Sequence, residues 1–428
     1  ELLRRIGRHS TLLGTFVAPD DLFRRTAGSA TPVGFGADAF PPTPLPTDAV
    51  AFTAAIDAIA AAARDAVARA DRLRPASTPV SAASHRSVPT AMPSRGHFRS
   101  IAGWWPGSRR DDPDLVLESD SIRVAVHPET GGILSLRRPG GGSNRLSQQL
   151  AVRGSSGHGR SRPDAVGRGM TASGVAGLVS RGRLLDADGR EVGTFAQGLS
   201  LLPGMPLVAV DVEVGLHAAG AGRLADDHVA CRFAWHENED VEIRRGVHGQ
   251  AVVTERTRFT APHFVEIVPV GTRGSAADAV TILSGGLPWH VRSTPHVLDT
   301  ILAGAAGTTR RRLAVGIGLE RPWDAAIEFA AGAAPGSGPR PGPANVRVTV
   351  HDVEVRDGRM VRARVGLLES AGSPGRVRVE WGRDVTAAAA RELDGRPRAG
   401  VDVAVEGQAV VVSLRSREWL LLDLEFGP

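Results

Sequence analysis

From residue 113 onward, short apolar segments recur along the chain, separated by residues that favour turns. In residues 121–126, for example, Ile122, Val124 and Val126 alternate with polar or small residues, the period-two pattern of a half-buried strand. Because these segments follow one another without intervening helices, they predict antiparallel sheets packed as a sandwich. The predicted strands of this region are 115–117, 121–126, 133–136, 175–185, 192–202, 207–216, 229–235, 251–259, 263–270, 279–284, 297–303, 312–319 and 326–330.

Composition divides the β region into two domains. Residues 331–344 are dominated by Gly, Pro and Ala and predict a linker between a large β-sandwich over 111–330 and a small β domain over 345–428. Residues 154–170 are polar and predict a long loop, a kind of segment that often carries function. The predicted strands of the small domain are 346–355, 360–367, 376–381, 401–405, 409–414 and 419–426.

The chain before residue 111 has a different character. Residues 47–74 predict one amphipathic helix, with Phe52, Ile56 and Ile59 on one face and Pro75 at its end. Residues 1–46 show no domain core. Residues 75–110 predict an irregular connection that includes Trp104 and Trp105.

Charge and cysteine content exclude several classes of protein. The formal net charge is +5, and the basic residues, all arginines, alternate with Asp and Glu along the chain. Nucleic-acid binding requires a clustered basic patch, so we expect no nucleic-acid partner. No apolar run reaches the roughly 20 residues that cross a bilayer, so we expect no membrane partner. The single cysteine, Cys231, lies in an apolar segment and is predicted to be a core residue.

Two groups of residues combine an aromatic ring with polar donors, which suits the apolar faces and hydroxyl groups of sugars. The candidate substrate-binding residues are Trp289, His290, Arg292, Arg232, Trp235 and His236. Gly285 to Pro288 favour a turn, so we expect Trp289 to pack inward while His290 and Arg292 project from the sandwich edge. The alternative is that the tryptophans are core residues and the arginines lie at the rim of a sheet.

The sequence predicts no metal site and no catalytic residue in this chain. His228 and His236 would lie about 26 Å apart on an extended strand, too far to share an ion. His290 and His296 are closer, but no cysteine and few carboxylates accompany them. No G-x-S-x-G motif is present, and Gly140 to Gly142 lack the lysine and the spacing of a phosphate-binding loop.

Two neighbouring motifs carry a resemblance to a known family. His127 to Leu136 reads HPETGGILSL, and Asn144 to Arg153 reads NRLSQQLAVR. In this order, they resemble the start of the large β-sandwich of glycoside hydrolase family 38, the α-mannosidases. The resemblance extends over roughly 115–428. It implies a galactose-mutarotase-like supersandwich, preceded by a linking helix and followed by a small β-sandwich.

The resemblance also implies a function. Members of the family hydrolyse α-mannosides with retention, which requires two carboxyl groups about 5 Å apart, and they hold zinc in an upstream catalytic domain. This chain lacks those motifs, so we expect a C-terminal portion of such an enzyme, with 1–46 as a remnant of its catalytic domain, an α-mannoside as substrate, and a cytoplasmic location. The alternative is a non-catalytic carbohydrate-binding or scaffold protein.

Overall fold

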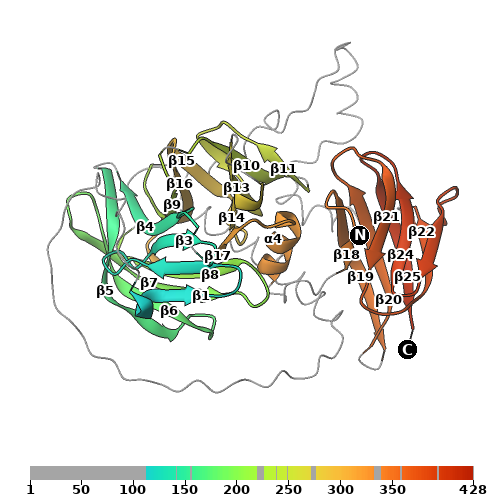
Figure 1. Ribbon diagram of the computed structural model, residues 1–428, viewed down its shortest axis with the longest axis horizontal. Helices are drawn as coiled ribbons and strands as arrows, with labels where there is room; N and C mark the ends of the chain where they lie inside the picture. The colour runs from blue at the N-terminus through green and yellow to red at the C-terminus, as the bar shows by residue number, and fades with distance from the viewer. Residues whose placement is uncertain are drawn as a thin grey trace, which may run out of the picture.

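The computed structural model describes residues 112–427 with gaps at 141, 155–156, 219–225, 238, 248, 271–275, 332–338, 357–358 and 393–394. The predicted remnant 1–46, helix 47–74 and connection 75–110 lie outside the described residues. The prediction of a mainly β, antiparallel protein is confirmed (Figure 1).

The strands of the large domain form two sheets. A three-stranded sheet has the order β1-β2-β3, and a 14-stranded sheet has the order β11-β10-β13-β14-β17-β8-β7-β6-β5-β4-β9-β16-β15-β12. Their bounds are β1 Val116–Glu118, β2 Arg123–Val126, β3 Ile133–Arg137, β4 Ser147–Gly154, β5 Gly157–Met170, β6 Ala176–Leu185, β7 Glu191–Leu201, β8 Leu207–Leu216, β9 His228–Ala234, β10 Val241–Val247, β11 Gln250–Val253, β12 Arg258–Thr260, β13 Phe264–Pro269, β14 Val280–Leu283, β15 Trp289–Thr294, β16 Val297–Ala303 and β17 Gly307–Ile317.

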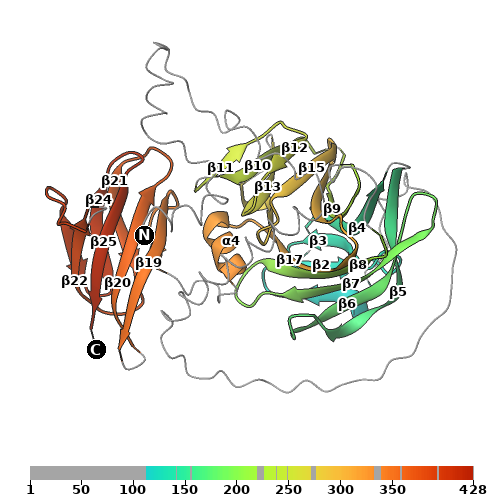
Figure 2. The same cartoon turned by 180° about the vertical axis from the view of Figure 1, so that it is seen from behind.

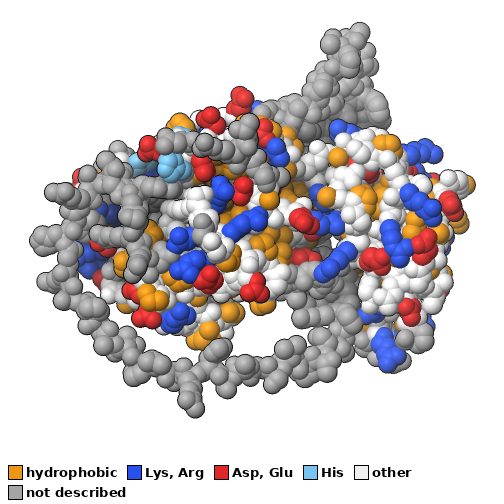
Figure 3. All heavy atoms as spheres, in the orientation of Figure 1, with side chains coloured by type: hydrophobic (Ala, Val, Ile, Leu, Met, Phe, Trp, Pro, Cys, Tyr) orange, Lys and Arg blue, Asp and Glu red, His pale blue; other side chains and the backbone are white. Residues whose placement is uncertain are grey.

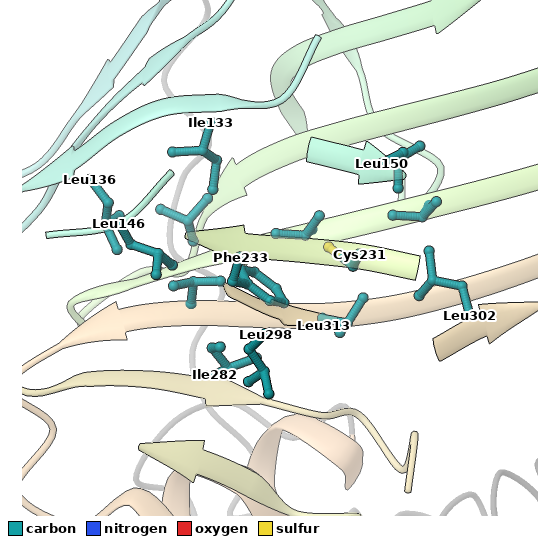
Figure 4. Packing of buried hydrophobic residues seen from close by; sticks show 14 of the residues in the cluster. Ile133, Leu136, Leu146, Leu150, Cys231, Phe233, Ile282, Leu298, Leu302 and Leu313 are labelled. Atoms are coloured by element: carbon teal, nitrogen blue, oxygen red, sulfur yellow. The ribbon is translucent and has the colours of Figure 1, made fainter. Parts of the chain in front are cut away.

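One continuous core joins the two sheets. Alternate residues of β4, β8, β9 and β14 face the same apolar cluster as the small sheet β1–β3, so the 14-stranded sheet curves around a shared interior. Figure 4 shows Phe233 and Cys231 from β9 in this cluster with Ile133, Leu298 and Ile282. Cys231 is fully buried, as predicted, and burial raises the pKa of its thiol. We call the opposite side of the 14-stranded sheet its outer face.

The predicted hairpin at 121–136 is confirmed, and its turn is inserted into the large sheet. Strands β2 and β3 pair antiparallel, and the turn between them lies against β5, β6 and β7. The backbone oxygen of Gly131 accepts hydrogen bonds from Ser180 Oγ (3.0 Å) and Gln197 Nε2 (3.0 Å). That of Thr130 accepts one from Ser161 Oγ (2.9 Å). The turn therefore fixes the position of the small sheet on the large one.

Two sequence-based predictions in the large domain are wrong. Residues 154–170, predicted as a loop, contain strand β5 in the interior of the sheet, paired with β4 and β6. Gly159 and Ser161 are buried and small, so the apolar alternation of a strand is missing. Residues 326–330, predicted as a strand, lie in helix α4 (Pro322–Ala331). A short apolar run does not distinguish a strand from a buried helix, and here Ala325, Ala326 and Phe329 cover the outer face.

The small domain is a sandwich of two four-stranded sheets, ordered β18-β21-β24-β23 and β19-β20-β25-β22. The predicted linker 331–344 includes β18, which belongs to this sandwich. Across both domains, strands β4, β10, β15 and β22 have no counterpart among the predicted segments. The bounds are β18 Arg340–Pro341, β19 Val346–Arg356, β20 Arg359–Glu369, β21 Gly375–Glu380, β22 Val385–Arg391, β23 Val403–Glu406, β24 Ala409–Leu414 and β25 Trp419–Phe426.

Arg347 of β19 in the small domain contacts α4 and the β10–β11 turn of the large domain. The two domains are seen side by side in Figures 1 and 2. Its guanidinium lies over the ring of Trp323 (5.8 Å to the centroid) and its Nε donates to the backbone oxygen of Gly249 (2.9 Å). Ser370 Oγ donates to the same oxygen (3.1 Å). A Cβ atom on Gly249 would lie 3.2 Å from both Arg347 and Ser370, so a glycine suits this contact.

Glu369 ties the loops of the small domain together. Its buried carboxylate accepts hydrogen bonds from the backbone of Ala371, Gly372 and Arg417 (each 2.8 Å) and from Asn345 Nδ2 (2.7 Å). Desolvation by burial acts to raise the pKa of this carboxyl group. The hydrogen bonds, led by the one from Arg417, outweigh desolvation and lower the pKa to about 2.

We expect Glu369→Gln to lower the free energy of unfolding at pH 7 by about 1.5–3 kcal/mol, because a neutral amide replaces a charged acceptor. A depressed pKa stabilises the fold above the ordinary value of 4.5, and this contribution is lost as the pH falls toward 2. The difference between wild type and variant in urea unfolding should therefore shrink between pH 5 and about pH 2. A difference that stays constant over this range would contradict the assignment.

Among the described residues, no helix is long and apolar enough to cross a membrane.

Candidate functional site

The predicted binding residues lie on β9, directly after β9 and on β15, and they divide between the two faces of the sheet. Alternation along β9 places Cys231 and Phe233 in the core and Arg232 on the outer face. Strand β16 pairs with both β9 and β15, so residues of all three strands are adjacent. The arrangement therefore separates the core residues from those that reach the outer face.

Trp289 and His290 belong to the core. Trp289 is 5% exposed and His290 is 1% exposed. The His290 ring stacks on Phe259 (5.5 Å between centroids), its Nδ1 contacts Thr300 Oγ1 (3.0 Å), and its Nε2 contacts the backbone oxygen of Ala261 (3.1 Å). Burial lowers the pKa of His290 to about 4, although hydrogen bonds to backbone oxygens oppose this. Contrary to expectation, His290 therefore does not project from the edge.

Arg292 and Trp235 meet at the β15–β16 turn. Arg292 is half-buried and donates from Nη2 to the backbone oxygen of Pro295 (2.8 Å). The backbone N–H of Trp235 donates to the backbone oxygen of His296 (3.2 Å), and the two rings meet edge-on, 6.4 Å apart. Trp235 is buried, and its Nε1 has no hydrogen-bond partner in the described part of the chain. His236 follows it and is half-buried.

Arg232 is the centre of a polar cluster on the outer face. Its Nε and Nη2 donate to the two carboxylate oxygens of Asp299 on β16 (2.7 and 2.8 Å). Ser293 Oγ also donates to Asp299 (2.5 Å). The Nη2 atom lies 3.1 Å from Nδ1 of His158 on β5. Asp299 is fully buried and Arg232 is 13% exposed, so the cluster reaches solvent through Arg232 and His158.

The protonation states follow from these contacts. Desolvation acts to raise the pKa of Asp299, but the hydrogen bonds and charge of Arg232 and the hydroxyl of Ser293 lower it overall. The pKa of His158 is lowered, first by desolvation and then by Arg232 and Arg153. Near neutral pH, Asp299 is therefore ionised and His158 is neutral. A neutral His158 accepts a hydrogen bond from Arg232 at Nδ1 and offers Nε2–H as a donor.

This cluster can bind and orient a polar ligand, but it has no proton to transfer. Asp299 accepts three charge-assisted or hydroxyl hydrogen bonds, so it positions Arg232 and does not act as an acid. The sequence pattern indicated Arg232 but gave no signal for His158, Ser293 or Asp299. Only the pairing of Arg232 with Asp299 across β9 and β16 brings these residues together, and no spacing in the sequence encodes that register.

The residues present do not fit a zinc ion. Within the described ranges, no group of three or more His, Cys, Asp or Glu side chains is placed to hold a metal. We therefore assign no metal ligand and no zinc-dependent step to the described residues.

Comparisons with known proteins give a similarity in structure only. No family model matches the chain, and no curated protein matches it. An alpha-mannosidase from Enterococcus faecalis V583 is 11% identical over 76% of this chain and 43% of its own length, with a TM-score of 0.47. A glycosyl hydrolase family 38 protein from Enterococcus faecalis gives the same identity and TM-score over 45% of its length. A chondroitin AC lyase from Streptomyces coelicolor A3 is 12% identical, with a TM-score of 0.21. The chain thus spans less than half of these proteins.

Proposed function

We propose that this chain is the C-terminal β portion of a retaining α-mannosidase-like glycoside hydrolase that acts on α-mannosidic bonds. One observation carries the proposal: the two motifs behind the family resemblance build the element on which the large domain is assembled. His127 to Leu136 forms the hairpin turn inserted against β5–β7, and Asn144 to Arg153 leads into β4, an interior strand of the large sheet. The two motifs, which are close in the sequence, therefore also contact the same large sheet.

In this proposal, the catalytic carboxyl groups and the zinc ion belong to another domain of the full-length protein. Retention requires two carboxyl groups about 5 Å apart, one as nucleophile and one as acid. The buried carboxylates of Asp299 and Glu369 are each held by several donors and are unsuited to either role. The residues of this chain contribute sugar contacts: Arg292 beside the β15–β16 turn, His236 directly after β9, and Arg232 on the outer face.

Aryl α-mannoside hydrolysis by the protein encoded in the complete reading frame tests the proposal. We expect turnover by that protein, loss of turnover after zinc chelation, and no turnover by residues 1–428 alone. Turnover by this chain alone would overturn the division of roles. If the full-length protein binds mannan but hydrolyses no α-mannoside, the chain is instead part of a non-catalytic carbohydrate-binding or scaffold protein.

Within the full-length protein, we expect Arg292→Ala to lower kcat/KM about ten-fold or more. A charged hydrogen bond to a sugar hydroxyl contributes on the order of 1.5–3 kcal/mol, and among the described residues the Arg292 guanidinium hydrogen-bonds only to a backbone oxygen. The melting temperature should stay unchanged, because the Pro295 oxygen can bond to water at the turn. Arg310→Ala, at a 76% exposed position on β17, is the matched control and should leave kcat/KM unchanged. Equal kinetics for both variants would make Arg292 a structural residue.

A further inference from the structure

The four adjacent strands β6, β5, β4 and β9 bring together arginines that lie far apart in the sequence. Their sequences contain seven arginines and a single acidic residue, Asp164. This excess of six is larger than the formal net charge of +5 of the whole chain. Arg168 turns toward the small sheet, where its Nη2 donates to the backbone oxygen of Val116 (3.2 Å). The other six define what we call the arginine band: Arg153, Arg160, Arg162, Arg181, Arg183 and Arg232.

Strand register places these arginines on one face. Arg162 lies directly opposite Arg183 on β6, and Ala151 of β4 lies opposite Arg160. Because side chains alternate along a strand, Arg160 and Arg162 share a face with His158. Arg153 pairs with His158, so the band continues through β4 to Arg232. Arg160, Arg162 and Arg181 are exposed. The outer-face positions of these strands include no Phe or Trp.

Half of the six arginines in the band have no ionic partner in the described part of the protein. Asp164 bonds to Arg183 (2.8 Å) and Asp299 to Arg232 (2.7 Å). Arg153, Arg162 and Arg181 make no ion pair with a described residue. In the small domain, by contrast, Arg362 pairs with Glu425 (2.7 Å) and Arg378 with Glu380 (2.6 Å). Figure 3 shows basic side chains beside acidic ones over the small domain.

Repulsion between the arginines of the band lowers the stability of the sheet when no ligand is bound. Like charges directly opposite each other on paired strands destabilise a sheet, and Arg162 faces Arg183 in this way. The positive field also acts on His158, whose pKa is lowered by desolvation and further by Arg232 and Arg153. An anionic ligand across β4–β6 would relieve this repulsion. Guanidinium groups bind carboxylates and sulfates with paired hydrogen bonds, which favours a bound carboxylate or sulfate group over diffuse counterions.

We propose that the arginine band binds an acidic polysaccharide through its carboxylate or sulfate groups. The polysaccharide class rests on the proposed function, whereas the negative charge rests on the band alone. Single-stranded nucleic acid is the other polyanion to consider, and its binding relies on aromatic rings that stack on bases. The band offers no such ring besides the imidazole of His158, but it has Gln149 beside Arg232 as a partner for hydroxyl groups.

Binding of polygalacturonate to the full chain tests the proposal. We expect binding at low salt that weakens as ionic strength rises, and no binding to the fully methyl-esterified polymer, which has the same backbone without charge. The double variant Arg162→Glu/Arg181→Glu should bind at least about ten-fold more weakly, because it removes two exposed cations and adds two anions. Its melting temperature should be equal to or above that of wild type, since the carboxylate introduced at position 162 would face Arg183.

The matched control is Arg359→Glu/Arg376→Glu in the small domain. Both positions are exposed, the change in net charge is the same, and Arg359 also lies opposite another arginine, Arg356. This control should keep its affinity for polygalacturonate within about two-fold, since it leaves the band intact. Equal losses in both double variants would mean that net charge alone attracts the polymer, and would overturn the proposal. So would tighter, band-dependent binding of a single-stranded oligonucleotide, or no binding of polygalacturonate by wild type. α-Mannoside hydrolysis is not part of this readout, so the two proposals fail separately.

Discussion

Replacing Arg232 with alanine is expected to lower the free energy of unfolding by about 3–5 kcal/mol, because it leaves the buried carboxylate of Asp299 without its main partner. Asp299 is fully buried and accepts two hydrogen bonds, which Nε and Nη2 of Arg232 donate. Ser293 alone cannot replace a full positive charge. Urea unfolding at pH 7 measures the loss. The double variant Arg232→Ala/Asp299→Ala should recover part of it, since no charge is then left buried.

The small domain offers a matched pair for comparison. Arg364 and Asp423 also face each other across neighbouring strands, with hydrogen bonds of 2.7 and 3.0 Å. Their side chains are 43% and 29% exposed, so solvent screens the pair. In addition, Arg391 bonds to Asp423 (2.9 Å) and remains when Arg364 is removed. Arg364→Ala should therefore cost less than about 1 kcal/mol. Similar losses for Arg232→Ala and Arg364→Ala would show that Asp299 is not held as a buried ion.

Gly132→Ala is expected to destabilise the large domain by about 3 kcal/mol or more, because the added methyl group meets backbone that cannot move independently. A Cβ atom on Gly132 would lie 2.0 Å from the backbone oxygen of Gln148 on β4. Relieving this overlap requires the turn to withdraw from the sheet. Such a shift would weaken the hydrogen bonds that Ser180 and Gln197 donate to Gly131.

Gly142→Ala is the control for this prediction. Gly142 follows the same hairpin, and the nearest atom to its Cβ position is 3.8 Å away. Its substitution should change the unfolding free energy by less than about 0.5 kcal/mol, as for surface positions in general. Thermal unfolding of both variants, followed by tryptophan fluorescence, measures the difference. If Gly132→Ala has the same melting temperature as the wild type, the turn is not a fixed part of the core.

Individual strands were predictable wherever one face is apolar. Strands β2, β8 and β24 follow the alternation or continuous apolar runs of their residues because their inward positions carry Val or Leu. Strand β5 was missed because Gly159 and Ser161 occupy its buried positions, where the backbone of Leu185 leaves no room for a larger side chain. Helix α4 was missed because residues 326–330 are a short apolar run that fits either element.

The candidate site was predicted only in part, for a related reason. The pattern of an aromatic residue next to arginine or histidine selected Trp235 and Arg292, which the structure brings to the β15–β16 turn at His296 and Pro295. The same pattern gave the wrong orientation for His290, because strand β15 is buried on both sides at its start. Trp289 and His290 are therefore both core residues, although they point to opposite faces.

The sequence alone specifies the mainly β class of the fold and the hairpin at the start of the large domain. These depend on local periodicity and turn chemistry, which neighbouring residues carry. The register of strands far apart in the chain was decided only by the tertiary structure. That register joins Arg232 to Asp299, 67 residues away, and aligns the arginines of β4, β5, β6 and β9. The physical reason is that register follows from burial and packing over the whole sheet, which no local pattern specifies.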